Sequence, residues 1–489
     1  MADPVLRALA AACPAAREAV PGDAVAGVLP RFAASPATVA EASALLRAAA
    51  EHDLAVVPRG GGSKLGWGAA PRRCDLVVDT AALGEVVEHA AGDLVARVQA
   101  GVSVARLGEV LAGAGQQLAL DPPPSGDRAP GADGPAPPAW LGATVGGTLA
   151  TGAAGPRRLR YGTPRDLIIG ITVVRADGAV AKSGGKVVKN VAGYDLARLF
   201  TGSFGTLGLI VEAVFRLHPL PAATAYVTVE CPGPDEAYRA AAAAARSDLA
   251  PSAIEIDRAA HGEPVRVAVL LEGGPDGTEE RAGLMRALLG PGAAARPSPP
   301  AWWGWPAGGD GRSGAADRPR ANGQRGAGGQ SGADGQPGAD RQPGGGTGPG
   351  QAGTLIRIAF WAAGLPRVLR VIDAAARAAG LDPAVGGSAA AGVIYAGTGP
   401  EADPAAVTAF VAALRAALAR GEADARPAAA PAPSGPPVLA SAVVVHAPPG
   451  VRDLVDPWGP VPSLSLMRAV KDQFDPGHRM APGRFVGGI

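Results

Sequence analysis

Cysteine and aromatic residues are scarce in this sequence, and each shortage excludes a class of protein. The three cysteines, Cys13, Cys74 and Cys231, lie far apart and form no Cys-x-x-Cys pair. They cannot supply a disulfide framework or the four thiolates of an iron–sulfur cluster. We therefore expect the protein to be located in a reducing cytoplasm. Aromatic residues are only 4% of the 489 positions, and alanine therefore supplies much of the 47% hydrophobic content.

A charge excess and long apolar runs are also missing. The formal net charge is +1, which gives no indication of a polyanionic partner. No run of about 18 apolar residues occurs, and no basic segment followed by an apolar core opens the chain, so we expect neither a membrane span nor a signal peptide. Any association with the inner membrane would then be peripheral, through partners. The six histidines show no paired spacing, so no metal site is predicted.

Glycine and proline are abundant instead, with 71 and 48 copies, and they mark insertions and loops. Residues 292–352 contain almost only small, polar and proline residues, which cannot bury enough apolar surface to order the chain. Residues 122–138 and 421–437 have the same character. We predict that all three segments are disordered surface insertions.

The remaining sequence predicts two domains of the α+β class. After an N-terminal extension of residues 1–30, residues 31–220 contain short strands with few helices, unlike the regular repeat of a doubly wound sheet. Residues 221–470 alternate strands and helices, which indicates an α+β sandwich with helices on one face. Residues 471–489 form a tail.

The segment "VVPRGGGSKLGWG", residues 56–68, joins a predicted strand to a glycine loop with two cations. It fits neither the P-loop, because Ser63 precedes Lys64, nor the dinucleotide fingerprint, because the third glycine position holds Leu65. The remaining interpretations are a backbone nest for an anion, aided by Arg59 and Lys64, or an ordinary glycine-rich turn. A β-branched residue at Gly61 would penalise a positive φ and a close approach in such a nest.

A second run, "WLGATVGGTLATGAAGPRRLRYG" at 140–162, consists largely of small residues. Such a run cannot fill a helical core with large side chains, but it can lie flat against a planar ligand or a diphosphate. The alternative is another low-complexity loop. A third segment, 184–219, mixes glycines with the polar residues Lys186, Lys189, Asn190, Tyr194 and Asp195 before a buried strand.

Four segments in this order resemble the vanillyl-alcohol-oxidase-type (PCMH-type) FAD-binding family. They are "PRGGGSKLGWG", "GATVGGTLATGAAGPRRLRYG", "KNVAGYDLARLFTGSFGTLGLIVEAVFRLHPLP" and the terminal "FDPGHRMAPGRF". The resemblance is close over 31–220 and in the tail, and only in pattern over 221–450. It implies a bipartite FAD domain, a ferredoxin-like α+β second domain, and a tail that returns to the FAD domain.

The resemblance also implies which residues bind FAD. The first loop would wrap the pyrophosphate, the second run would line the pyrophosphate and flavin, and the later strand would offer backbone groups to the adenine end. These residues are Pro58, Arg59, Gly60, Gly61, Gly62, Ser63, Lys64; Thr144, Gly146, Gly147, Thr151, Gly152, Gly162; and Leu209, Ile210. Covalent members carry a histidine in the first loop, which this sequence lacks, so noncovalent FAD is expected.

Catalytic residues are less clearly indicated. Tyr194, Lys189 and Asn190 are candidates for the reactive face of the flavin, although a packing role fits them equally. Arg484 would bind a substrate carboxylate or anchor the tail. It stands in Ala481-Pro482-Gly483-Arg484, where the family usually has Asn-Pro-Gly-Arg.

The resemblance to FAD-binding subunits of glycolate oxidases implies oxidation of glycolate or another D-2-hydroxy acid. Its implied partners are a larger FAD subunit and an iron–sulfur subunit that would receive the electrons. Two alternatives remain open. One is a non-catalytic electron-relay or scaffold subunit, favoured by the absence of paired histidines, and the other is a stand-alone alcohol or sugar oxidase.

Overall fold

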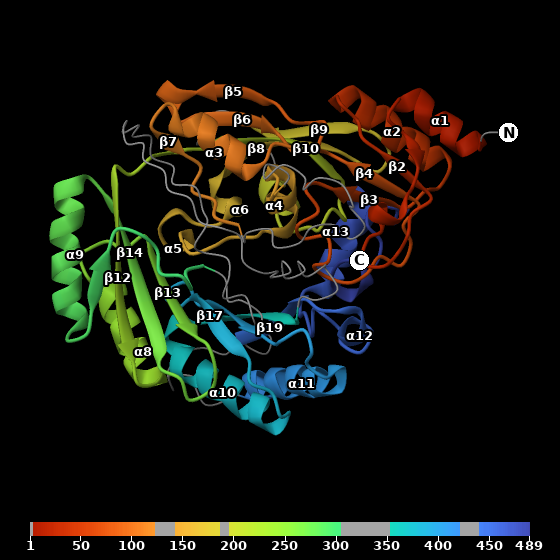
Figure 1. Ribbon diagram of the computed structural model, residues 1–489. Coiled ribbons are helices and arrows are strands. Elements are labelled where there is room, and N and C mark those ends of the chain that lie inside the picture. The colour runs from red at the N-terminus through yellow and green to blue at the C-terminus, as the bar shows by residue number, and fades with distance from the viewer. Residues whose placement is uncertain (1–2, 123–141, 186–194, 305–352, 421–439) are drawn as a thin grey trace, which may run out of the picture.

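The computed structural model describes residues 3–122, 142–185, 195–304, 353–420 and 440–489. The described residues form an N-terminal part with two larger sheets and a two-stranded one, and a C-terminal part with one large sheet (Figure 1). This α+β organisation agrees with the prediction. The candidates Lys189, Asn190 and Tyr194 lie outside the described residues.

The first N-terminal sheet follows the order β1-β2-β4-β3, with β2, β4 and β3 parallel. Its strands are β1 Arg17–Glu18, β2 Phe32–Ala34, β3 Val56–Arg59 and β4 Leu76–Asp79. Helices α1 (Pro4–Ala12) and α2 (Val39–Glu51) pack on this sheet around buried leucines and alanines. Thr38 caps α2 by accepting from the backbone N–H of Glu41, and the Glu41 carboxylate accepts from the N–H of Ala37 and not from that of Thr38.

The second sheet is antiparallel, in the order β5-β6-β10-β8-β9. Its strands are β5 Val86–Ala90, β6 Val95–Gln99, β8 Ile168–Val174, β9 Val180–Gly184 and β10 Leu209–Arg216, and a separate pair is formed by β7 Gln116–Gln117 and β11 His218–Pro219. The helices of this region are α3 Val104–Ala112, α4 Val145–Thr151, α5 Arg158–Tyr161, α6 Pro164–Leu167 and α7 Leu196–Phe200. The small-residue run thus contains a short helix, α4, because Val145 and Leu149 reach the core from between its glycines.

The C-terminal sheet has eight strands in the order β15-β12-β14-β13-β17-β18-β16-β19, all antiparallel to their neighbours. They are β12 Ala223–Cys231, β13 Ala253–Arg258, β14 Val265–Gly273, β15 Ala294–Arg296, β16 Leu355–Phe360, β17 Ala384–Ser388, β18 Val393–Gly397 and β19 Ala440–His446. Helices α8 (Pro234–Arg246) and α9 (Pro275–Leu289) belong to the first half, and α10 (Leu365–Ala378) and α11 (Pro404–Arg420) to the second. Each half is a β-α-β-β-α-β unit, so the ferredoxin-like motif occurs twice, joined through β13 and β17.

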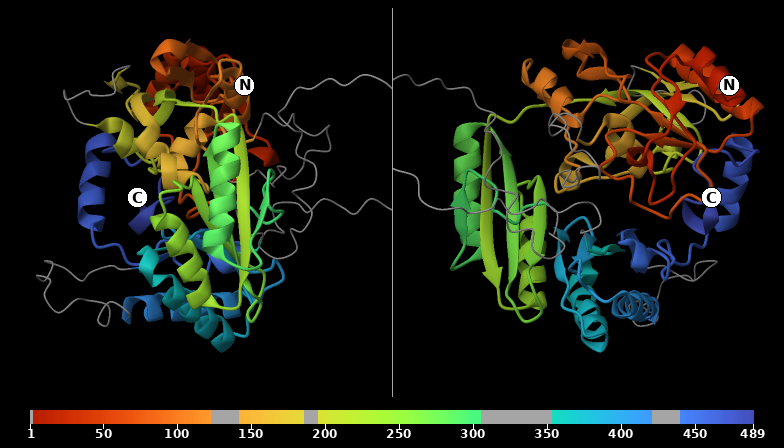
Figure 2. Two further views of the ribbon diagram at one scale, coloured as in Figure 1. Left: turned by 90° about the vertical axis from the view of Figure 1, so that its left-hand side faces the viewer. Right: turned by 45° about the vertical axis from the view of Figure 1, so that its right-hand side comes forward.

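All four of these helices cover one face of the eight-stranded sheet, and the other face is turned toward the N-terminal part (Figures 1 and 2). The side-chain alternation of the strands explains this arrangement. On β14, Val267, Val269 and Leu271 join the helix-covered core, while Arg266 and Glu272 point to the opposite face. Polar side chains of the sheet are therefore directed at the N-terminal part.

Two short strands were not expected from the sequence. Ala294–Arg296 lie in the segment predicted to be an insertion, yet they pair with β12 as edge strand β15. Strand β17 contains Gly386 and Gly387, which have no side chain to produce an alternating pattern. Residues 305–352 and 421–439 lie outside the described part of the chain.

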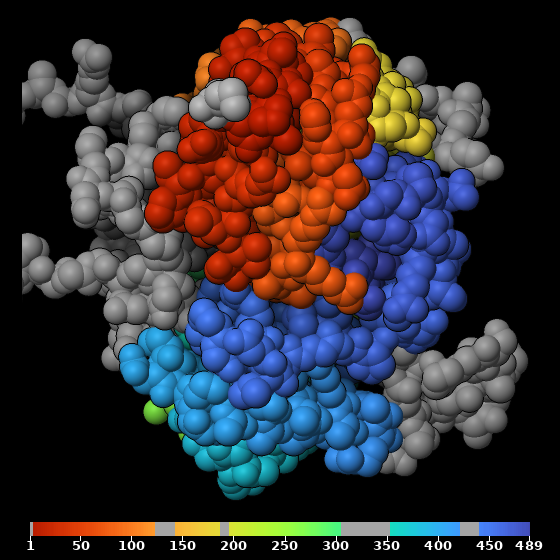
Figure 3. Space-filling view, turned by 90° about the vertical axis from the view of Figure 1, so that its right-hand side faces the viewer, coloured from red at the N-terminus to blue at the C-terminus, as the bar shows by residue number. Residues whose placement is uncertain are grey.

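The C-terminal tail lies beside the N-terminal residues (Figure 3). After α12 (Pro449–Arg452) and α13 (Leu464–Phe474), the backbone of Arg479 and Ala481 exchanges hydrogen bonds with Val56 at 2.8 and 2.7 Å. The buried Lys471 ammonium fastens this tail, because it donates to Asp475 (2.6 Å), to the carbonyl of Thr206 (2.7 Å) and to the carbonyl of Met480 (2.9 Å).

Candidate FAD-binding site

A cavity lies at the carboxyl end of β3, where the glycine loop, helix α4 and the C-terminal tail meet. The residues that line it are Pro58, Arg59, Gly60, Gly61, Gly62, Ser63, Lys64, Leu65, Thr144, Gly147, Ala150, Thr151, Phe204, Gly205 and Arg484. The structure therefore brings together the first loop and part of the second run, which are about 80 positions apart in the sequence, together with the tail.

The glycine loop is tightly apposed to the start of α4. A Cβ atom at Gly60 would lie 2.2 Å from Oγ1 of Thr144, so any side chain there would displace the threonine. That threonine hydroxyl accepts a hydrogen bond from the Gly147 N–H at 3.1 Å and caps α4. The left-handed residue of the loop is Gly62, with φ 76°, and not Gly61, so the positive φ expected at Gly61 is wrong by one position.

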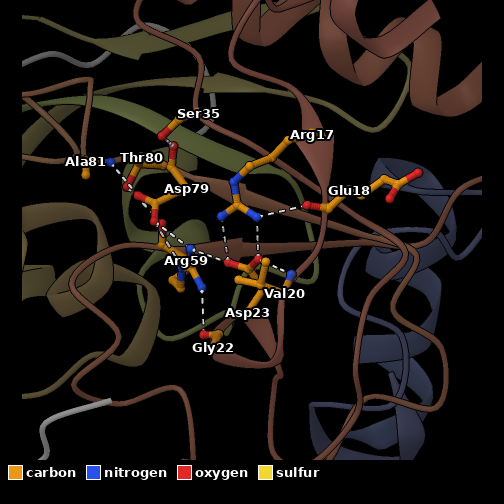
Figure 4. A network of polar contacts seen from close by, with 10 residues as sticks. All are labelled: Arg17, Glu18, Val20, Gly22, Asp23, Ser35, Arg59, Asp79, Thr80 and Ala81. Atoms are coloured by element: carbon orange, nitrogen blue, oxygen red, sulfur yellow. Dashed lines mark hydrogen bonds and ion pairs between the residues drawn. The ribbon is translucent and has the colours of Figure 1, made fainter. Parts of the chain in front are cut away.

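The Arg59 side chain lines the cavity, but its charge is already compensated. Its guanidinium pairs with Asp23 at 3.0 Å and with Asp79 at 2.9 Å, inside a network that also contains Arg17 (Figure 4). Hydrogen bonds from Arg17 and Val20, together with Arg59, outweigh the burial of the Asp23 carboxyl and lower its pKa to about 2. Arg59 therefore serves to hold the loop against β4, and less of its charge is available to an anion.

Lys64 is different, because it is buried without a carboxylate partner among the described residues. The residue is 8% exposed, and among the described residues its ammonium makes only a 3.4 Å contact with the Ser63 hydroxyl and a distant contact with the Trp67 ring. Burial lowers the pKa of Lys64 from its ordinary value of 10.5 to about 8. At neutral pH the ammonium is still charged, and an anion in the cavity would stabilise it.

Arg484 brings a second cation to the same cavity. Its Nη2 donates to the carbonyls of Leu65 and Trp67, both at 2.8 Å, so it anchors the tail to the loop. The residue is 4% exposed, and its Nη1 atom is buried with no hydrogen-bond partner in the described part of the chain. Burial lowers the pKa of Arg484 to about 10, which leaves it charged at neutral pH.

Five of the predicted cofactor residues do not line this cavity. Gly146 packs on Ala100, Gly152 ends α4 with φ 63°, and Gly162 ends α5 with φ 84°. Leu209 and Ile210 are buried in β10, paired with Val174 and Val173 of β8. In the structure these residues shape the scaffold around the cavity.

Four residues that line the cavity were missed in the sequence: Leu65, Ala150, Phe204 and Gly205. Phe204 has φ 56°, which is rare for a residue with a side chain, and it packs on Trp458 and Phe485. The short stretch "GSFGTLG" around it was part of the family resemblance, but a single apolar residue there has no signal of its own.

The residues fit a diphosphate group by two criteria. Two buried cations, Lys64 and Arg484, face one cavity, and one of their nitrogen atoms has no partner among the described residues. The glycine loop exposes backbone at a place where a Cβ atom would clash. Within the described residues, His, Cys, Asp and Glu side chains form no group of three or more that could hold a metal ion, and no helix has the length and apolar character to cross a membrane.

Comparison with known proteins supports the same cofactor. Residues 30–132 and 127–184 match the family described as "FAD binding domain". Glycolate oxidase subunit GlcD of Bacillus subtilis is 36% identical over 193 residues, 40% of this chain and 38% of that protein. Glycolate oxidase subunit GlcE of Escherichia coli is 36% identical over 139 residues, 28% of this chain and 36% of that protein. The chain thus spans less than half the length of these relatives.

Among solved structures, p-cresol methylhydroxylase with substrate bound superposes with a TM-score of 0.63 over 98% of this chain and 96% of that one, at 15% identity. At this identity the likeness concerns the fold alone. The predicted fold, a PCMH-type FAD-binding domain followed by an α+β domain, is confirmed, and FAD is the cofactor.

Proposed function

We propose that this chain is the FAD-binding subunit, similar to GlcE, of a complex that oxidises glycolate or a related D-2-hydroxy acid to the 2-oxo acid. The observation that carries the FAD site is the buried Lys64, since it lines the cavity with no carboxylate partner in the described residues. The oxidation of a hydroxy acid is inferred from the two glycolate oxidase relatives. FAD would supply the acceptor for a hydride when bound.

In this proposal, the loop from Pro58 to Lys64 holds the diphosphate, with Thr144, Gly147 and Thr151 on the opposite wall. Arg484 touches the same cavity, so we assign it to the cofactor and not to the substrate carboxylate. Gly146, Gly152, Gly162, Leu209 and Ile210 would support the site from behind. Lys189, Asn190 and Tyr194 stay proposed for the reactive face of the flavin.

We further propose that FAD is held noncovalently. In the described part of the chain, no histidine, cysteine or tyrosine lines the cavity, and these are side chains that could form a bond to the flavin. The proposed partners are a GlcD-like FAD subunit and a GlcF-like iron–sulfur subunit. The three buried, unpaired cysteines of this chain offer no cluster ligands, so electrons would leave through such a partner, in the cytoplasm or at the inner membrane.

The test is anaerobic mixing of the purified FAD-loaded chain with glycolate or D-lactate, alone and with co-expressed partners. Bleaching of the oxidised flavin by the chain alone supports catalysis by this subunit. Bleaching that requires a partner supports the relay role, and bleaching only by other alcohols or sugars supports a stand-alone oxidase. Acid precipitation tests the linkage separately, because flavin that stays in the pellet would contradict noncovalent binding.

A further inference from the structure

A second, smaller cavity lies between the N-terminal part and the eight-stranded sheet. One wall is the segment that follows α4, residues 154–156 and Arg158, and the other wall includes Glu255 of β13, Ser388 of β17 and Tyr395 of β18. The FAD cavity is lined by Thr144, Gly147, Ala150 and Thr151, so the two cavities lie at the two ends of one short stretch.

Strand register explains why polar side chains meet there. Glu255 lies directly opposite Ser388 in the antiparallel pair of β13 and β17. Ile254 and Ile256 point into the helix-covered core, so Glu255 between them points to the other face. That face is turned toward the N-terminal part (Figure 2).

Two of these side chains have polar atoms without partners. Glu255 is 2% exposed and Ser388 is 3% exposed. Oε1 of Glu255 and Oγ of Ser388 are buried and make no hydrogen bond in the described residues. A buried polar atom without a hydrogen bond is unfavourable in free energy, so a polar ligand that bonded to these two atoms would remove that penalty.

Arg158 places a positive charge in the same cavity. Its Nε donates to the carbonyl of Gly155 at 3.0 Å, which holds the guanidinium close to its own segment. The neighbouring Tyr161 and Arg157 fasten that segment to β14 of the sheet, because Tyr161 donates to Glu272 at 2.9 Å and Arg157 pairs with the same carboxylate at 3.9 Å. The segment that carries Arg158 is therefore held in place by hydrogen bonds and ion pairs.

Burial raises the pKa of Glu255 well above its ordinary value of 4.5, and the positive charge of Arg158 opposes this shift only in part. A carboxyl group with a raised pKa is a stronger base when it is ionised. Asp257, two residues further on the same face of β13, differs because Arg266 pairs with its carboxylate outside the cavity.

We propose that this cavity is the substrate pocket for a small 2-hydroxy acid, with Arg158 and Ser388 binding its carboxylate and Glu255 accepting its hydroxyl proton. The inference rests on the function proposed above. In the reaction, the hydroxyl proton would pass to Oε1 of Glu255, and FAD, when bound, would supply the acceptor for the carbinol hydrogen as a hydride. The substrate carbon thereby loses two electrons and forms the carbonyl of the 2-oxo acid.

The first test compares Glu255→Gln with the matched control Asp257→Asn in the FAD-loaded chain, with the partners present. Because a positioned base contributes about 100-fold to 10,000-fold, Glu255→Gln should slow flavin bleaching by glycolate at least about 100-fold. FAD content and far-ultraviolet circular dichroism should match those of the unsubstituted protein. Asp257→Asn should change the bleaching rate by less than about threefold.

The second test measures binding of oxalate, a dicarboxylate that cannot be oxidised in this way, by titration calorimetry. Arg158→Gln should weaken oxalate at least about tenfold, the loss expected for a charged hydrogen bond, while Asp257→Asn should leave it unchanged. This readout needs no turnover, so it tests the pocket independently of the reaction.

The two proposals fail in different ways. If the unsubstituted protein bleaches with glycolate and Glu255→Gln bleaches equally fast, the pocket assignment of Glu255 is overturned while the proposed function stands. If oxalate binds Arg158→Gln as tightly as the unsubstituted protein, the carboxylate subsite is overturned. If no 2-hydroxy acid bleaches the flavin even with partners, the proposed function is refuted and the proton transfer with it.

Discussion

Replacing Lys64 with methionine should have opposite effects on the free protein and on FAD binding. The pKa of Lys64 falls from 10.5 to about 8 on burial, which corresponds to about 3 kcal/mol of unfavourable free energy when the ammonium is charged. Methionine fills similar space without that charge. At pH 7 the FAD-free Lys64→Met protein should therefore be more stable, by up to about 3 kcal/mol.

The sign of the pH dependence follows from the same shift. Below pH 8 Lys64 is charged in both the folded and unfolded states, so the burial penalty is present in full. Between pH 8 and 10.5 the folded state releases its proton first, and the penalty disappears. The stability gain of Lys64→Met should thus be largest at neutral pH and vanish above about pH 10.5.

FAD affinity should change in the other direction. A hydrogen bond from a charged group contributes about 1.5–3 kcal/mol, so the dissociation constant should rise about 10-fold to 150-fold in Lys64→Met. In the unsubstituted protein the affinity should weaken as pH rises through about 8, where the free lysine loses its charge.

Urea unfolding of the FAD-free protein and a fluorescence titration with FAD measure the two effects. Lys182→Met is the matched control, because Lys182 is exposed on β9 and away from the cavity, and neither quantity should change. A Lys64→Met protein that is less stable without FAD, or that binds FAD with unchanged affinity, would refute the assignment of Lys64 to a diphosphate.

Three further perturbations test the scaffold around the site. Gly60→Val should prevent FAD retention after gel filtration, since its Cβ would lie 2.2 Å from Oγ1 of Thr144, whereas Gly22→Ala, with nothing within 4 Å, should retain FAD normally. Lys471→Met should lower the unfolding free energy by about 3–5 kcal/mol in a urea titration, because it leaves the buried Asp475 carboxylate unpaired, and an unchanged midpoint would contradict this. The lowered pKa of Asp23, about 2, contributes stability that is present above pH 3.8 and lost as pH falls toward 2. Asp23→Asn should lose no stability from this carboxyl group in an acid-unfolding titration. If its stability fell with pH as that of the unsubstituted protein does, the pairing of Asp23 with Arg17 and Arg59 would not stabilise the fold.

Much of the FAD site can be predicted from the sequence, because a loop with accessible peptide groups needs only the right consecutive residues. Three consecutive glycines after a buried strand predict a loop whose peptide groups are accessible, and the structure puts all three on the cavity wall. The sequence did not predict which glycine of the loop has a positive φ, because the structure shows it at Gly62 and not at Gly61. Neighbouring glycines carry no signal that distinguishes a left-handed residue from one that only allows a close approach.

The roles of the charged side chains could not be predicted from the sequence. Arg59 and Lys64 look equivalent in the sequence, but Asp23 and Asp79, which come from other elements, pair with Arg59 and not with Lys64. The same applies to Arg484, whose contacts to Leu65 and Trp67 join residues more than 400 positions apart. Glu255 and Arg158 also meet only because the sheet is docked on the segment after α4.

The glycine loop, the alternation of the strands and the shortage of cysteine can be read from neighbouring residues and composition. Which cations keep an uncompensated charge, and which polar atoms are buried without partners, depends on how distant segments pack. The physical reason is that the free energy of a buried charge depends on the groups packed around it, and those groups come from distant parts of the chain.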